Sequence, residues 1–178
     1  MDFKTGDILF TSRKPKLSKP KTWVSGVINL LQTKKLRNLD QTPTHTGQII
    51  FIYGIAYVID SDTDGVDVEL FEKWAKGRSF IKVFRPNVLT DVGIPLYTER
   101  ALSKAGNKYG FKSANALRNH LEGKLDVDDY IRTTTEFDLQ ACSIFTAWLY
   151  MMKQWQIQTP QSLWVNRFKN FPNGEDCL

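Results

Sequence analysis

The sequence predicts an α+β domain in which a small antiparallel sheet packs against helices. Two runs rich in β-branched and aromatic residues, 47–53 and 55–60, are separated by Gly54 and predict an antiparallel hairpin. A late segment, residues 138–155, has apolar side chains on one face at helical spacing and predicts the longest helix. Shorter strands and helices between these segments complete the class.

The first third of the chain predicts a strand, a loop and a helix. Residues 8–10 are apolar and follow a Gly-Asp pair, which indicates a turn and then a short buried strand. Residues 12–21 are basic and contain two prolines, so we expect a loop. Residues 23–31 carry apolar side chains at helical spacing, and the cations that follow suit the negative end of a helix dipole.

Short elements follow the hairpin. Val66 and Val68 alternate with acidic residues and predict a strand, and residues 71–74 predict a helical turn. Next we expect a strand, two helices and a loop, over residues 80–85, 97–105, 113–121 and 126–135. Aromatic side chains near the end of the chain are expected to pack back onto the body, at Trp164, Phe168 and Phe171.

The composition is that of one globular domain spanning residues 1–178. Hydrophobic residues make up 42% of the chain and aromatic residues 12%, which is enough to build a core. No apolar run approaches the roughly 20 residues that a transmembrane helix needs, and the N-terminus lacks the apolar segment of a secretion signal. We therefore expect a cytoplasmic protein, or one that is carried in a virion or delivered to the cell envelope by another route.

The positive charge of the chain is concentrated near the N-terminus. The net charge is +5, and the segment from Thr11 to Leu39 contains eight cations and no acid. A solvated loop and an exposed helix face explain such a run most simply. The alternative is contact with an anionic polymer or surface, through Arg13, Lys14, Lys16, Lys19 and Lys21. No aromatic residue separates these five cations, so stacking on nucleic-acid bases is not indicated.

Cys142 is a candidate nucleophile because it lies near the start of the predicted long helix. The free N–H groups and positive dipole end of a helix favour a thiolate, and they can stabilise the oxyanion that forms when a carbonyl is attacked. A buried structural cysteine on an amphipathic helix is the alternative, since free cysteine is among the most buried residue types.

His45 is the candidate base, at the mouth of the first hairpin strand. Equal arms about Gly54 would pair position 45 with position 63, whereas a tighter turn would bring Asp60 or Ser61 close to it. Asp60 has the suitable chemistry, because a carboxylate can accept the second N–H of the imidazole and fix its tautomer. The alternative role of Asp60 is a solvated acid beside a turn.

Other chemistry finds less support in the sequence. His120 is a rival base, but it lies in a polar helical stretch and we expect it at the surface. Serine-nucleophile, phosphate-loop and dinucleotide motifs are absent, and the two histidines and two cysteines are too far apart in sequence to predict a metal site or a cofactor. The second cysteine, Cys177, is expected in a frayed tail.

Several blocks, in their order along the chain, resemble those of the circularly permuted NlpC-type cysteine hydrolases, in particular the YiiX-like branch. Residues 104–110 also resemble a segment that precedes the cysteine in that family. The main blocks are Gly6-Asp7-Ile8-Leu9-Phe10, Thr44-His45-Thr46-Gly47-Gln48-Ile49-Ile50, Tyr57-Val58-Ile59-Asp60-Ser61 with Gly65-Val66, and Cys142-Ser143-Ile144-Phe145.

The resemblance implies a papain-like fold with Cys142 as nucleophile, His45 as base and Asp60 as the third polar residue. In papain-type enzymes the cysteine precedes the histidine, so the reversed order here fits a permuted chain. The sequence departs from the family at Ile144, where the family often has Glu, and at Asp60, where it has Glu. Residues 112–135 are not explained by the family pattern.

The expected function is hydrolysis of peptide or cell-wall peptide bonds through a thioester, by a protein of bacterial or phage origin and without a cofactor. Two alternatives stay open. One is an acyl hydrolase or acyltransferase that acts on lipids with the same fold. The other is a binding or structural module that has kept the fold without turnover.

Overall fold

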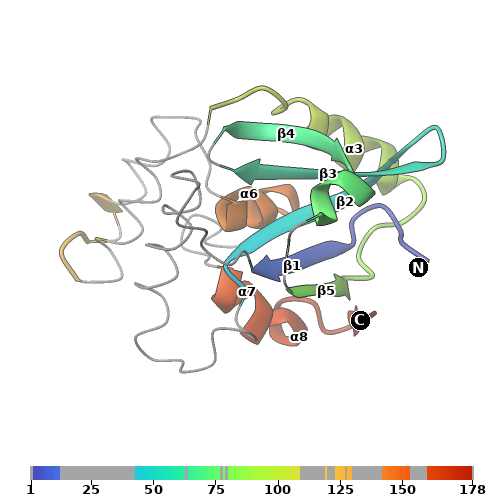
Figure 1. The fold of residues 1–178 in the computed structure, drawn as a ribbon. Helices are drawn as coiled ribbons and strands as arrows, with labels where there is room; N and C mark the ends of the chain where they lie inside the picture. The colour runs from blue at the N-terminus through green and yellow to red at the C-terminus, as the bar shows by residue number, and fades with distance from the viewer. Residues whose placement is uncertain are drawn as a thin grey trace.

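The computed structural model describes residues 2–12, 43–62, 64–76, 78, 80–108, 119, 123–126, 128–129, 142–152 and 160–177. Within them the strands form one antiparallel sheet in the order β4-β3-β2-β1-β5-β6 (Figure 1). Their bounds are β1 Ile8–Ser12, β2 His45–Ile52, β3 Ile55–Asp62, β4 Gly65–Leu70, β5 Phe80–Arg85 and β6 Glu175–Asp176. The predicted α+β class is confirmed.

Helices cover both faces of this sheet. The described helices are α2 Phe71–Ala75, α3 Gly93–Leu102, α6 Cys142–Leu149, α7 Pro160–Val165 and α8 Arg167–Asn170. Helix α6 packs on one face together with α3 and α7, whereas α2 covers the other face (Figure 1). None of the helices in the described part of the chain has the length and hydropathy needed to span a bilayer.

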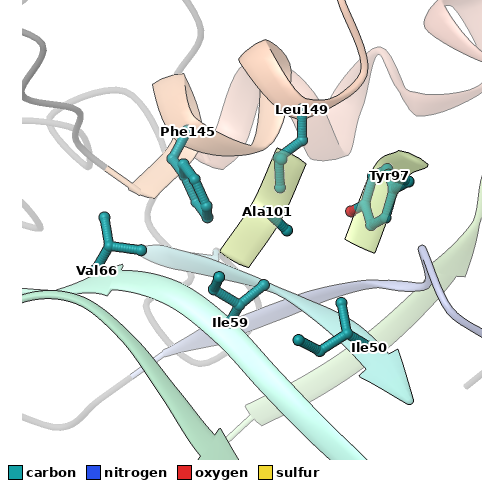
Figure 2. Packing of buried hydrophobic residues seen from close by; sticks show 7 residues of the cluster. All are labelled: Ile50, Ile59, Val66, Tyr97, Ala101, Phe145 and Leu149. Atoms are coloured by element: carbon teal, nitrogen blue, oxygen red, sulfur yellow. The ribbon is translucent and has the colours of Figure 1, made fainter. Parts of the chain in front are cut away.

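The two faces of the central strands build two parts of the core. On the α6 face, Ile50 and Ile59 lie below Phe145 and Leu149 of that helix, with Tyr97 of α3 beside them (Figure 2). On the α2 face, the neighbouring strand residues, which include Leu9, Ile49, Val58 and Val83, pack around Trp74. Because successive side chains of a strand point to opposite faces, central strands buried on both sides read as continuous apolar runs.

The turn of the β2–β3 hairpin is shorter than a turn centred on Gly54 with arms of equal length. The turn consists of Tyr53 and Gly54, both with positive φ, as a two-residue hairpin turn of type I′ requires. The register pairs Gly47 with Asp60, so the alternative in which position 45 faces position 63 is wrong. Cross-strand partners point to the same face, and His45 is two residues from Gly47. Asp60 and His45 therefore share a face.

Helix α6 ends earlier than the predicted helix 138–155. The N–H of Met151 donates to the carbonyl of Trp148, and the N–H of Met152 donates to that of Ala147. With Met151 in the left-handed region at φ 51°, these bonds make a Schellman motif that closes the helix after Leu149. The prediction was wrong here because the motif uses methionine where glycine is the usual signal. Helix α3 is likewise shifted toward the N-terminus relative to the predicted 97–105.

The C-terminal segment is part of the sheet, so the expected frayed tail is wrong. Strand β6 pairs with β5, and the Cys177 N–H donates to the Val83 carbonyl at 2.8 Å. The predicted aromatic packing is confirmed: the ring centroids of Phe10 and Trp164 are 5.1 Å apart, and Phe84 contacts both Phe168 and Phe171. Pairing with β5, which is distant in the sequence, holds the short strand β6 in place.

Other sequence predictions have mixed outcomes. The strands over 8–10, 66–69 and 80–85 and the helical turn at 71–74 are confirmed. The basic cluster of residues 13–21, the predicted helix 23–31 and His120 lie outside the described residues. Most of the predicted helix 113–121 and of the predicted loop 126–135 lies outside them as well.

The Gly-Asp pair before β1 has a structural role. Asp7 is buried, with 1% of its surface exposed, and Arg85 of β5 binds its carboxylate through Nε at 2.8 Å and Nη2 at 2.9 Å. The Lys4 N–H donates to the same carboxylate. Gly6 has φ 92° and lies against Leu89 and Tyr150, where a Cβ atom would collide. The buried ion pair thus joins the start of β1 to the end of β5.

We predict that Arg85→Ala lowers the free energy of unfolding by about 3–5 kcal/mol, because it leaves the Asp7 charge buried without its partner. Urea denaturation measures this loss. The matched control is Lys73→Ala, which removes an exposed cation paired with Glu69 and should change stability little. Equal effects of the two substitutions would contradict the role of the buried pair.

Candidate active site

The structure brings together the three residues that the sequence singles out. His45 is the first residue of β2, Asp60 lies near the end of β3, and Cys142 is the first residue of α6. Nε2 of His45 is 2.5 Å from Oδ2 of Asp60, and Cys142 lies close enough to the same imidazole to raise its pKa. Because Nε2 is bound to Asp60, Nδ1 is the ring nitrogen available to the sulfur.

These groups are largely removed from solvent. Only 7% of Cys142 and 12% of the His45 side chain are exposed. Burial by itself lowers the pKa of His45, but the charges of Cys142 and Asp60 and hydrogen bonds to both raise it to about 10. The raised pKa means that the folded protein favours the protonated form of His45.

Two further side chains bind Asp60, and no motif in the sequence marks them as part of the site. The Trp74 indole Nε1 donates to Oδ2 of Asp60 at 2.6 Å, and Nη2 of Arg78 lies 3.3 Å from the same oxygen. A buried tryptophan usually donates its N–H to an acceptor. Trp74, on a short amphipathic turn, was therefore the sequence signal for a further hydrogen-bonding side chain at the site. Its acceptor could not be read from spacing alone.

Gly47 allows Trp74 to reach Asp60. A Cβ atom at position 47 would lie 2.7 Å from Cγ1 of Val58 and 3.0 Å from Cζ2 of Trp74. The indole therefore packs directly over the backbone of β2, between the His45 and Ile49 side-chain positions. The glycine of the Thr-His-Thr-Gly segment is explained by this close approach rather than by backbone conformation.

The opposite face of β2 positions the start of α6. The Thr146 hydroxyl donates to the Cys142 carbonyl at 3.0 Å and accepts hydrogen bonds from the Gln48 amide and the Thr46 hydroxyl. All three side chains are buried. Strand β2 thus carries the histidine on one face, while its next polar residues fix the first turn of the cysteine helix from the other face.

Comparison with known proteins supports the fold. No family model matches the sequence, and no curated protein matches it either. Among solved structures, the α+β architecture is similar to the crystal structure of "metalloprotein yiiX from Escherichia coli O157:H7", with a TM-score of 0.55 and 18% sequence identity. The match covers 83% of this chain and 64% of that chain. At this identity the two proteins share a fold.

We predict that Gly47→Ala lowers the free energy of unfolding by about 1–3 kcal/mol, because the added methyl group would overlap Cγ1 of Val58 and crowd the indole of Trp74. Chemical denaturation measures the loss. Gly93→Ala is the control, since a Cβ atom there meets only Oγ1 of Thr90 at 3.5 Å. A neutral Gly47→Ala variant would show that neither Val58 nor the indole is closely packed against this position.

We predict a specific pH dependence of stability. The folded-state pKa of His45 is raised from 6.5 to about 10, so protonation of this residue stabilises the folded state. That contribution is complete below about pH 6.5 and is lost as the pH rises through about 10. The difference in unfolding free energy between the wild type and His45→Gln should shrink over this window. A difference that stays constant or grows would contradict an imidazolium at neutral pH.

Proposed function

We propose that this protein is a cysteine hydrolase that cleaves amide bonds through a thioester on Cys142. One observation carries the proposal: a histidine that is held by a buried carboxylate lies within electrostatic reach of Cys142, in the first described turn of α6. This combination is what an activated thiol nucleophile requires. The order of the histidine before the cysteine supports a permuted papain-like arrangement.

The mechanism follows from the positions of the three groups. The Cys142 thiolate attacks the amide carbonyl, and the N–H groups at the start of α6 are suited to stabilise the oxyanion. His45 gives its proton to the leaving amine as the C–N bond breaks, which leaves a thioester. Neutral His45 then takes a proton from water, and the resulting attack on the thioester releases the acid and restores the Cys142–His45 pair. Asp60 orients the ring throughout.

A metal ion does not fit the described donors. YiiX is described as a metalloprotein, but the described residues here contain no group of three His, Cys, Asp or Glu side chains placed to hold an ion. Nε2 of His45 is already bound by Asp60. The proposed reaction is derived from the thiol, the imidazole and the helix N–H groups.

We predict that Cys142→Ala lowers hydrolysis by a factor on the order of 10³ or more and abolishes the acyl adduct. The experiment incubates the protein with cell-wall peptides, other peptides and acyl lipids, and follows products and adducts on intact protein by mass spectrometry. Cys177→Ala is the control, because this second thiol lies beyond β6 and far from the site in sequence. It should retain both the activity and the adduct.

The same panel separates the alternatives. Release of new amines with a transient acyl adduct supports an amide hydrolase, whereas adducts formed only from acyl lipids support the lipid enzyme of the same fold. A protein that binds a substrate without turnover or adduct would be the non-catalytic module. An adduct that persists in Cys142→Ala would contradict the assignment of the nucleophile.

A further inference from the structure

We propose that Arg78, held by Trp74, is a positioning residue that sets the pH range in which Cys142 and His45 form their ion pair, and that it acts through Asp60. The inference rests on the proposed function, because it assigns a role to residues beside the proposed catalytic groups. The effect of Arg78 and Trp74 passes through a single carboxylate oxygen.

Oδ2 of Asp60 accepts from three donors that come from different parts of the chain. They are His45 at 2.5 Å, Trp74 at 2.6 Å and Arg78 at 3.3 Å. The Asp60 side chain is 6% exposed and the Arg78 side chain 1%. A guanidinium this deeply buried needs an anionic partner, and Asp60 supplies one.

Trp74 fixes the guanidinium of Arg78. The Cζ atom of Arg78 lies 3.6 Å from the centroid of the Trp74 ring, and its Nε donates to the Trp74 carbonyl at 2.9 Å. The Arg78 N–H also donates to the carbonyl of Ala75, which holds the backbone after α2. The side chain is therefore clamped by a cation–π contact and by hydrogen bonds, which is typical of a positioned charge.

The charges of the site balance when Arg78 is included. In the ion-pair state, Cys142 and Asp60 are anions and His45 and Arg78 are cations. Among the described residues, two other acids lie on the same face of the sheet near Asp60. They are its cross-strand partner on β4, Asp67, which is exposed, and Asp62, which is two residues further along β3 and half-buried. On α2, Lys73 is paired with Glu69 at the surface. Without Arg78 the buried site would carry a net negative charge.

The sign of the effect follows from electrostatics. Each deprotonation step makes the site more negative, so removing a nearby positive charge makes each step less favourable. Loss of Arg78 should therefore move both the formation of the thiolate and the later loss of the His45 proton to higher pH. A residue with only a packing role would lower stability without moving both steps in one direction.

The experiment measures alkylation of Cys142 by iodoacetamide as a function of pH, read on the Cys142 peptide by mass spectrometry. Cys177 in the same chain is the internal reference thiol. NMR titration of the imidazole Cε1–H, assigned with His45→Gln, follows the second step. Arg78→Met should raise the midpoints of both steps by about one pH unit. Arg78→Lys should restore part of the shift, because it keeps a cation without the planar fork.

Lys73→Met is the matched control, since it removes an exposed cation from α2, five residues before Arg78, and should leave both midpoints unchanged. If Arg78→Met does not fold, Arg78→Lys and Trp74→Phe decide the question, and each should give a smaller upward shift. Unchanged midpoints in folded Arg78 and Trp74 variants, or an equal shift in Lys73→Met, would overturn the inference. A wild-type Cys142 profile that matches Cys177 would instead overturn the proposed function.

Discussion

The carboxylate of Asp60 is the point on which the arrangement around Cys142 depends. A buried carboxylate is costly unless hydrogen bonds and opposite charges compensate for lost hydration. Here one carboxylate oxygen accepts hydrogen bonds from an imidazole, an indole and a guanidinium. These donors are His45 of β2, Trp74 of α2 and Arg78, which lies three residues beyond the end of α2. The same contact therefore orients the histidine and attaches α2 to its face of the sheet.

Strand β2 connects this carboxylate to the cysteine. His45 and Gly47 face Asp60 and the indole, whereas Thr46 and Gln48 face α6 and hold its first turn through Thr146. Alternation of side chains along one strand thus serves two purposes within four residues. Because His45 is the first residue of the strand, its ring can contact a helix on the other face. A change in register by one residue would exchange the two sets of side chains.

Local patterns predicted much of the fold and three members of the site. The strands and the α2 turn were predictable because apolar periodicity and turn residues act over a few positions. The end of α6 was not, since its Schellman motif places methionine in the left-handed position. Strand β6 was not predicted because it has two residues, which are too few to show a periodic pattern. Its pairing with β5 is a contact between segments that are distant in the sequence.

The sequence by itself determined the α+β class, the hairpin and the identity of Cys142, His45 and Asp60 as candidates for chemistry. Only the tertiary structure decided that these groups meet and that Arg78 and Trp74 join them. The physical reason is that hydrogen bonds and ion pairs between distant residues depend on strand register and on close packing to within a fraction of an ångström. The two-residue turn at Tyr53 and Gly54 selected Asp60, and the missing side chain of Gly47 admitted the indole.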